Sequence, residues 1–271
     1  MKIFAVRDEY DDSRKSLAYL IYYEKAKRFY IEIPEEADSW ETPLLLESFV
    51  KRGERSINAY WSRMWVQQRI VPTDRQNLGQ ILKENGLESY DEFELLMLGK
   101  GRCAQDDYYL EPVTQVDFLR EFVQRYQKKV EDVIPLENGQ LLIFFQNGEV
   151  KKCDMYKLLA HERRFQPVLK NTQLFCSVGM QPGGYGISWG EGLDVADRQL
   201  YDSGGSISLK MEDFIRFIFH RVISTSEAAE ILECSRQNID DLVRRGKLHP
   251  IKELSQNKLF LKSEIMQRKW G

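Results

Sequence analysis

The spacing of hydrophobic residues changes along the chain, and each change predicts a different kind of element. Residues 1–34 hold short runs of β-branched and aromatic residues, and the two runs around residues 24–27 predict a hairpin. Further along, the apolar residues recur at helical spacing, with one helix expected to run from Ser56 until Pro72 stops it. Residues 1–112 are therefore predicted to form an N-terminal α+β domain, a hairpin plus a helical cluster, whose role the sequence does not give.

A strongly amphipathic segment follows, and residues 113–129 are predicted to form a connecting helix. Its apolar side is expected to consist of Val116, Leu119, Phe122, Val123 and Tyr126. In the next segment, 130–205, Asn-Gly pairs at 138–139 and 147–148 stand between β-rich runs, which is the strongest short-range signal for hairpins. We expect a three-stranded meander, a helix and two more strands around residues 183–184, together a small central α+β domain.

After a linking helix predicted at 206–222, residues 223–271 contain two short helical patterns joined by a three-residue turn. Ala228 and Ala229 are small enough to let the helices approach closely, and Gly246 is expected to end the second helix. Three apolar residues of that helix are expected to face inward: Ile239, Leu242 and Val243. The whole chain is thus assigned to the α+β class.

Two short strands at 251–254 and 259–261 are predicted next, with Lys258 at the tip of the wing that they form. The order "T-x-E-A-A-x-x-L", a turn, "S-R-x-x-I…L-x-x-x-G-K-L", a wing and a short helix resembles excisionase and MerR-type winged helix-turn-helix modules. That resemblance implies a DNA-binding domain at 223–271. One departure concerns the turn, which often carries Gly where this chain has Glu233, so a strained backbone or a different turn is expected.

The second helix of this pattern carries the side chains that can read DNA. Arg236, Gln237 and Asn238 are types that contact base edges, Arg with guanine and Asn or Gln with adenine. Residues further along are expected at phosphates, which fix the register without reading sequence. The full set of candidate DNA-binding residues is Thr225, Ser235, Arg236, Gln237, Asn238, Arg244, Arg245, Lys247 and Lys258.

The central segment carries a second resemblance. Its "F-x-N-G-E" hairpin, the downstream "L-x-x-x-x-x-F", the "G-I-x-W" strand and the following "L-D" resemble the domain of unknown function 2442. This bacterial family is sometimes followed by a helix-turn-helix and often lies beside small toxin-like genes. It has no established catalytic residues to carry over. Trp189, Phe145 and Phe175 are predicted to be core, and Asp194 to cap a turn.

Charge supports a binding module attached to an acidic body. The chain has a net charge of −3, whereas residues 221–271 hold ten Lys or Arg against seven Asp or Glu.

The N-terminal domain has a segment rich in aromatic residues and arginine around Trp61 and Trp65. We predict that these tryptophans lie in the core and that the nearby arginines are solvated. The alternative is a protein interface made of arginine and aromatic side chains. The triplet Arg-Gln-Asn occurs at 75–77 as well as 236–238, so a second nucleic-acid surface is an alternative there.

Catalytic chemistry finds little support in the residues. Residues 186–190 fit the G-x-S-x-G pattern, but a poor helix start follows Ser188, and a nucleophile elbow requires a helix there. The three histidines form no ligand pair with cysteine, and the glycine-rich stretch near residue 184 lacks a phosphate-binding lysine. We therefore expect no enzyme activity, no metal and no cofactor.

Cellular context follows from the cysteines and the first residues. No two of the four cysteines form a CxxC pair, and residues 1–15 lack the apolar core of a secretory signal, so we expect free thiols and a cytoplasmic location away from membranes.

The leading hypothesis is a bacterial DNA-binding regulator or antitoxin-like repressor that binds double-stranded DNA as a homodimer or with a protein partner. The alternative is a protein-interaction scaffold in which the helix-turn-helix is only a packing element.

Overall fold

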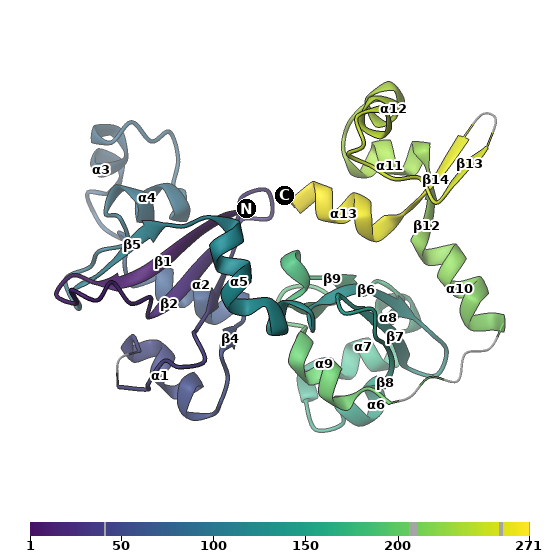
Figure 1. The fold of residues 1–271 in the computed structure, drawn as a ribbon, viewed down its shortest axis with the longest axis horizontal. Coiled ribbons are helices and arrows are strands. Elements are labelled where there is room, and N and C mark those ends of the chain that lie inside the picture. The colour runs from purple at the N-terminus through teal and green to yellow at the C-terminus, as the bar shows by residue number, and fades with distance from the viewer. Residues whose placement is uncertain (41, 206, 208–210, 255–256, 271) are drawn as a thin grey trace. The chain divides into compact units, whose positions relative to one another are not determined.

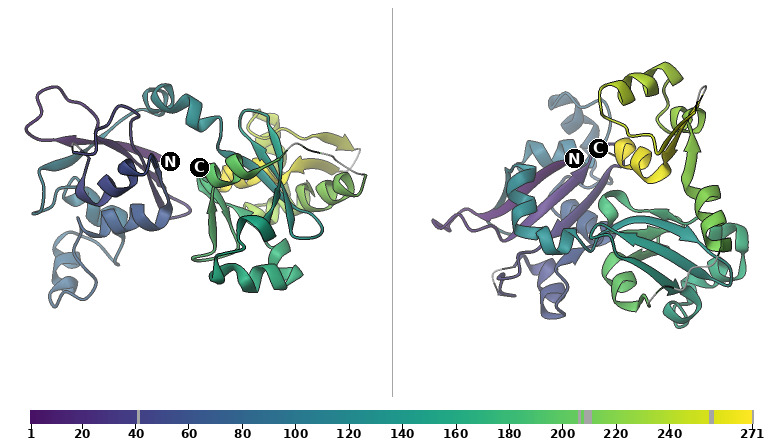
Figure 2. Two further views of the ribbon diagram at one scale, coloured as in Figure 1. Left: turned by 90° about the horizontal axis from the view of Figure 1, so that it is seen from below. Right: turned by 45° about the vertical axis from the view of Figure 1, so that its right-hand side comes forward.

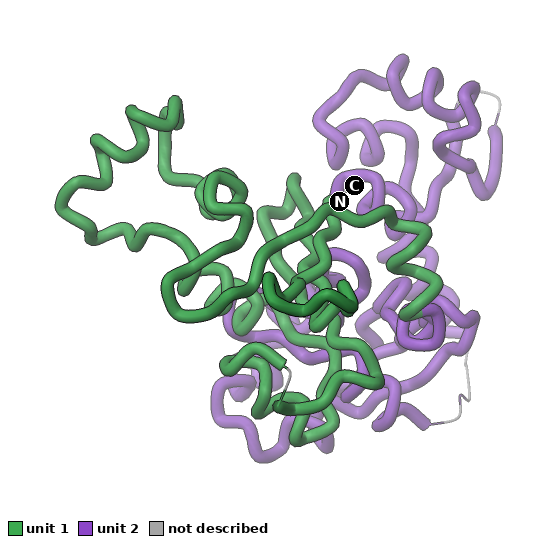
Figure 3. Tube along the Cα trace, turned by 60° about the vertical axis from the view of Figure 1, so that its left-hand side comes forward, with its two compact units in different colours: residues 1–122 green, residues 123–271 purple. Residues whose placement is uncertain are grey.

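The structure is a computed structural model that describes residues 1–40, 42–205, 207, 211–254 and 257–270. It is α+β, as the sequence predicts, and it divides into two compact units, residues 1–122 and 123–271 (Figure 3). The boundary between the units falls within helix α5 (Gln115–Tyr126). That helix occupies most of the segment expected to connect the N-terminal and central domains.

The first unit is built on a five-stranded antiparallel sheet with the order β4-β3-β2-β1-β5 (Figure 1). The predicted hairpin is confirmed as β2 and β3, which pair Ile21 with Tyr30. The helix expected from Ser56 is wrong at its start, because Ile57 pairs with Ile31 and the helix begins only after the cap of Asn58. The strands are β1 (Lys2–Asp8), β2 (Ala18–Tyr23), β3 (Arg28–Glu32), β4 (Ser56–Ile57) and β5 (Tyr108–Pro112).

Helices α1 (Leu44–Lys51), α2 (Ala59–Gln67), α3 (Leu78–Glu84) and α4 (Glu92–Leu98) complete the first unit. Trp65 is fully buried in the core as predicted, whereas Trp61 is 37% exposed. Arg69 departs from the expectation of a solvated arginine. Its guanidinium is buried against the Trp65 ring and pairs with Asp106 at 2.5 Å, because Asp106 lies close to β5, next to the core.

The predicted apolar side of helix α5 is buried only in part. Phe122, which belongs to that side, is buried against the ring of Tyr19 together with Phe118, at centroid distances of 5.3 and 5.7 Å. Val116 and Val123, which also belong to it, are at least half exposed. The aromatic contact with β2 fixes the rotation of the helix, and spacing along the sequence does not contain that contact.

The central part of the second unit contains the predicted meander, with β6 (Val130–Pro135), β7 (Gln140–Phe145) and β8 (Val150–Asp154) in that order. A second sheet has the order β11-β10-β9, with β9 (Gly179–Met180), β10 (Gly186–Ser188) and β11 (Asp194–Ala196). Asp194 therefore starts a strand where a turn cap was predicted. Trp189, Phe145 and Phe175 are buried, as expected.

Short helices surround these sheets: α6 (Met155–Leu158), α7 (Gln166–Lys170), α8 (Thr172–Cys176) and α9 (Asp197–Ser203), with 3-10 turns η1 (Arg163–Phe165) and η2 (Pro182–Gly184). The first of the two strands expected around residues 183–184 is shorter than predicted. The Asn171 side chain accepts a hydrogen bond from the Leu174 backbone N–H and starts α8, so the residues up to Cys176 are helical.

Helix α10 (Met211–Arg221) lies beside the meander and leads into the C-terminal domain (Figures 1 and 2). One face of the meander packs in the central core, and the other face meets α10 through Phe144 and Phe217, whose ring centroids are 5.7 Å apart. Residues 206 and 208–210 of the predicted linking helix lie outside the described residues.

A buried charge pair fixes the end of α10 to the meander. The Arg221 Nε lies 2.9 Å from Asp132 Oδ1 on β6, and both side chains are about nine-tenths buried. Ser263, on α13 (Lys262–Trp270), also hydrogen-bonds Asp132. Burial raises the pKa of Asp132, and the positive charge of Arg221 partly offsets that rise. Central domain, linking helix and C-terminal domain therefore meet at one carboxylate.

Candidate nucleic-acid interface

The C-terminal domain is a helix pair closed by a small winged sheet (Figures 1 and 2). Strands β12 (Val222–Ser224), β14 (Asn257–Leu261) and β13 (Lys252–Leu254) lie side by side in that order. Helices α11 (Thr225–Ile231) and α12 (Arg236–Arg244) pack their apolar faces together. The buried side chains include Ala228, Ala229, Ile239 and Leu242, as the spacing predicts, together with Leu248, Phe260 and Ile265.

A capping box starts α11. The Ser224 hydroxyl accepts a hydrogen bond from the Glu227 backbone N–H, and the Glu227 carboxylate accepts one from the Ser224 backbone N–H. The bond from the Ser224 backbone N–H and a second one from the Ser224 hydroxyl to the same carboxylate lower the pKa of Glu227. The sequence reading overlooked this cap although its signature, Ser followed three residues later by Glu, is present.

The turn between the helices is strained as expected. Glu233 has φ of 54°, the left-handed conformation that favours glycine. Cys234 closes the turn by donating its backbone N–H to the Ala229 carbonyl, at 2.9 Å. Gly246 ends α12 at φ of 65°, which confirms the predicted terminus.

Replacing Glu233 with glycine is expected to raise the free energy of unfolding by about 1 kcal/mol, because the left-handed backbone then carries no Cβ. Urea unfolding of the full chain measures this. Glu233→Ala is the matched control, since it also removes the 3.3 Å pair with Lys269 but keeps the Cβ. Equal stability of the two variants would show that the turn is not the cause.

The first turn of α12 presents three polar side chains to solvent. Ser235 caps the helix by accepting a bond from the Asn238 backbone N–H, so its hydroxyl is already used locally. Arg236, Gln237 and Asn238 are exposed. Among the described residues, no side chain pairs or hydrogen-bonds with these three. They are therefore available to a ligand at no cost in broken intramolecular contacts.

The two aspartates of α12 are each paired with a cation. Asp240 pairs with Lys258 of the wing, and Asp241 pairs with Arg244 one turn along the helix. The Asp240 contact raises the pKa of Lys258. These pairs reduce the repulsion that bare carboxylates would exert on phosphates, but they also occupy two of the predicted phosphate contacts.

The remaining candidate DNA-binding residues differ in exposure. Arg245 and Lys247, on either side of Gly246, are exposed and form no ion pair within the described part of the chain. Thr225 is buried, and its hydroxyl exchanges hydrogen bonds with the backbone of Lys258. Its side chain thus holds the wing against α11.

The wing itself is confirmed, with a change in its tip. Lys258 was expected at the tip, but it lies within β14 and pairs with Glu253 of β13. The predicted tip residues Ser255 and Gln256 lie outside the described residues. The strand extends further than predicted because Asn257 accepts a bond from the Thr225 backbone N–H, at 3.3 Å.

Comparison with protein families agrees with this geometry. A family model described as a helix-turn-helix domain matches residues 222–270. The segment is thus similar to helix-turn-helix domains in sequence as well as in the arrangement of its two helices. The match spans both helices, the wing and α13, and it suggests DNA binding. Searches of curated proteins and of solved structures found no match to the chain. The likeness of the central segment to the domain of unknown function 2442 stays a prediction.

The other motifs noted in the sequence do not form a catalytic or metal site among the described residues. The Ser188 hydroxyl donates to the Gly190 carbonyl at 2.8 Å and accepts from the Gly190 backbone N–H, and no helix follows it. Over the described ranges, His, Cys, Asp and Glu side chains form no group that could hold a metal ion. None of the described helices has the length and apolar character needed to cross a bilayer.

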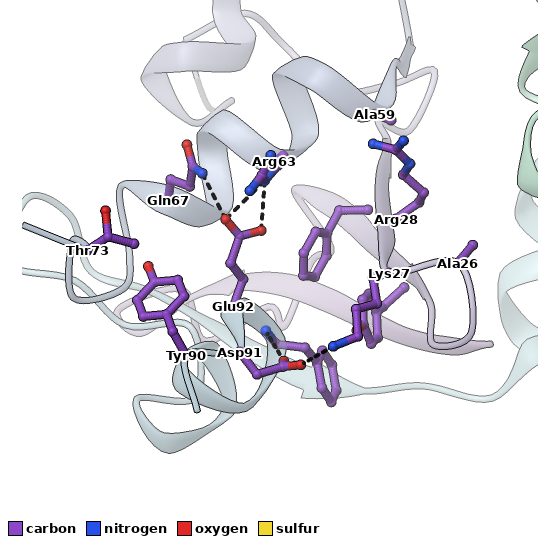
Figure 4. Close-up of a pocket in the computed structure, with 13 residues that line it drawn as sticks. Ala26, Lys27, Arg28, Ala59, Arg63, Gln67, Thr73, Tyr90, Asp91 and Glu92 are labelled. Atoms are coloured by element: carbon purple, nitrogen blue, oxygen red, sulfur yellow. Dashed lines mark hydrogen bonds and ion pairs between the residues drawn. The ribbon is translucent and has the colours of Figure 1, made fainter. Parts of the chain in front are cut away.

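The first unit contains a pocket of about 550 Å³ between α2, α4 and the turn that joins β2 to β3 (Figure 4). Its charged side chains largely neutralise one another. Lys27 pairs with Asp91 at 3.0 Å, and Arg63 pairs with Glu92 at 2.9 Å. The volume is that of a small-molecule site, but these internal pairs favour no ligand class over another.

Proposed function

We propose that this chain binds double-stranded DNA sequence-specifically through its winged helix-turn-helix and acts as a transcriptional regulator. The observation that carries the proposal is the first turn of α12, where Arg236, Gln237 and Asn238 are exposed and have no side-chain partner among the described residues. Arginine reads guanine and the two amides read adenine through paired hydrogen bonds, so this turn has the chemistry of a major-groove reader.

Phosphate contacts are assigned to the end of the same helix. Arg245 and Lys247 flank its C-terminus and form no ion pair with any residue that the structure describes. Arg244 and Lys258, by contrast, would first have to leave Asp241 and Asp240. A carboxylate near a phosphate is unfavourable, so DNA binding is expected to move these two cations from aspartate to phosphate or to keep both aspartates away from the backbone.

The biological role follows from the resemblances given by the sequence. A central segment like the domain of unknown function 2442, joined to a helix-turn-helix and associated with toxin-like genes, supports an antitoxin-like repressor. The acidic remainder of the chain would then bind a protein partner or mediate self-association. Because one short helix reads few base pairs, we expect two copies on a palindromic site.

Selection from a random double-stranded DNA library with the full-length protein tests the proposal. The expected result is one recovered sequence, bound at least about 100-fold more weakly by the Arg236→Ala/Asn238→Ala variant, since each paired base contact contributes about 1–3 kcal/mol. The Arg245→Ala/Lys247→Ala variant should instead weaken binding to every sequence. It should also reduce the slope of log affinity against log salt concentration by about two, because two phosphate contacts are lost.

The chain offers a matched control in its other Arg-Gln-Asn triplet. Arg75 and Asn77 are joined by a 3.1 Å hydrogen bond in the first unit, and Arg75→Ala/Asn77→Ala makes the same chemical change. We expect this variant to bind as the wild type does. Recovery of no preferred sequence, or equal binding by all variants, would overturn the proposal in favour of the protein-interaction scaffold.

A further inference from the structure

Helix α10 has an apolar side that faces away from the meander. Phe217 and the buried Arg221 and Asp213 point toward the sheet. The opposite side is a stripe with i, i+3, i+4, i+7 and i+8 spacing, which is the pattern of a helix that packs on a partner. The stripe consists of Met211 (70% exposed), Phe214 (53%), Ile215 (59%), Ile218 (59%) and Phe219 (81%).

The size of this stripe matches an interface better than an ordinary surface. Large apolar side chains present roughly 200 Å² each, so these five leave about 600 Å² of apolar surface on one helix. Isolated apolar patches on monomers seldom exceed that size, and two such helices facing each other would bury about 1,200 Å², the lower end of specific interfaces.

We infer that α10 pairs antiparallel with α10 of a second copy of this chain. The stripe maps onto itself about a two-fold axis across its middle. Ile215 of one copy then lies opposite Ile218 of the other, and Phe214 lies opposite Phe219 in the same way. Antiparallel packing also places the N-terminal end of each helix beside the C-terminal end of the other, which suits both helix dipoles.

Charged side chains that flank the stripe are paired on the meander side. Arg216 pairs with Glu137 at 2.5 Å, and Asp213 pairs with Lys152 at 3.8 Å. Both partners belong to the meander, so neither of these charges has to be buried between the two copies.

A dimer through α10 would extend the proposed function, and its role in DNA recognition rests on that function. Arg221, at the end of the same helix, joins α10 to β12 and to Asp132, so the helix-turn-helix is held at a set angle to the stripe. An axis through α10 would thus fix the relation between two copies of α12, which is what recognition of a palindrome requires.

Sedimentation of the full-length protein without DNA tests the interface separately from DNA binding. We expect a wild-type dimer and a dissociation constant at least about 30-fold higher for Ile218→Glu, whose side chain is central and exposed. Leu44→Glu is the control, because Leu44 is an 86% exposed leucine on α1 and receives the same charge. Circular dichroism checks that both variants stay folded.

A charge cycle tests the antiparallel register. Ile215→Lys and Ile218→Glu should each weaken the dimer, and the double variant should recover part of the loss, because it places opposite charges across the axis. A monomeric wild type, a dimer unaffected by Ile218→Glu, a dimer lost with Leu44→Glu alone, or absence of recovery would overturn the inference. A dimer that binds no DNA leaves the interface standing and overturns the proposed function, whereas a monomer that binds DNA does the reverse.

Discussion

Replacing Arg221 with methionine is expected to lower the free energy of unfolding by about 3–5 kcal/mol, because it leaves the Asp132 carboxylate buried without its cation. The two side chains are 2.9 Å apart and about nine-tenths buried. In the variant the Val133 backbone N–H and Ser263 are the groups that would still bond Asp132 within the described part of the chain. Urea unfolding followed by circular dichroism measures the change.

Two controls separate the buried charge from the loss of an arginine. Arg216 is on the same helix as Arg221 and forms a more exposed pair with Glu137. Arg216→Met should therefore lower the free energy of unfolding by less than about 1 kcal/mol. Arg221→Met combined with Asp132→Leu should recover most of the stability, since no unpaired charge stays buried. If Arg221→Met costs no more than Arg216→Met, the junction contributes little to the stability of the second unit.

Replacing Gly184 with alanine is expected to lower the free energy of unfolding by about 4 kcal/mol, from left-handed strain and a backbone clash together. The residue has φ of 73°, and an added Cβ would lie 2.3 Å from the Val130 carbonyl oxygen. Relief requires η2 to move away from β6, where the buried Lys129 pairs with Asp197 at 3.0 Å. Chemical denaturation of the purified variant gives the value.

The chain holds a glycine that isolates the clash. Gly148 has φ of 81° in the turn between β7 and β8, and an added Cβ there would meet nothing within 4 Å. Gly148→Ala should therefore cost only the left-handed strain, about 1–2 kcal/mol. Similar losses for the two variants would contradict the role given to the Val130 contact.

Local signals predicted those parts of the fold that local physics determines. The Asn-Gly pairs placed both turns of the meander, because hairpin turns need a residue that tolerates positive φ, as Gly139 and Gly148 do here. By contrast, β4 has two residues and β5 follows a loop, so only their pairing with β3 and β1 makes them strands. The rotation of α5 was missed for the same reason, since Tyr19 lies far away in sequence.

The candidate interface shows the same division. Helical spacing placed Ile239 inside and Arg236 outside without knowledge of the rest of the domain. The pairing of Lys258 with Asp240 depends on how the wing folds back onto α12, and the burial of Thr225 depends on β14. Helical spacing therefore predicts the exposed polar turn of α12 but not which cations the fold already pairs with aspartates.

The direct passage from α10 into the wing has a mechanical consequence. Arg221 is the last residue of the helix and Val222 the first of β12, with no loop between them. Since β12 pairs residue by residue with β14, a rotation of α10 is transmitted to the wing as a tilt instead of being absorbed by a hinge. A shift of α10 on the meander would therefore tilt the wing relative to the central domain.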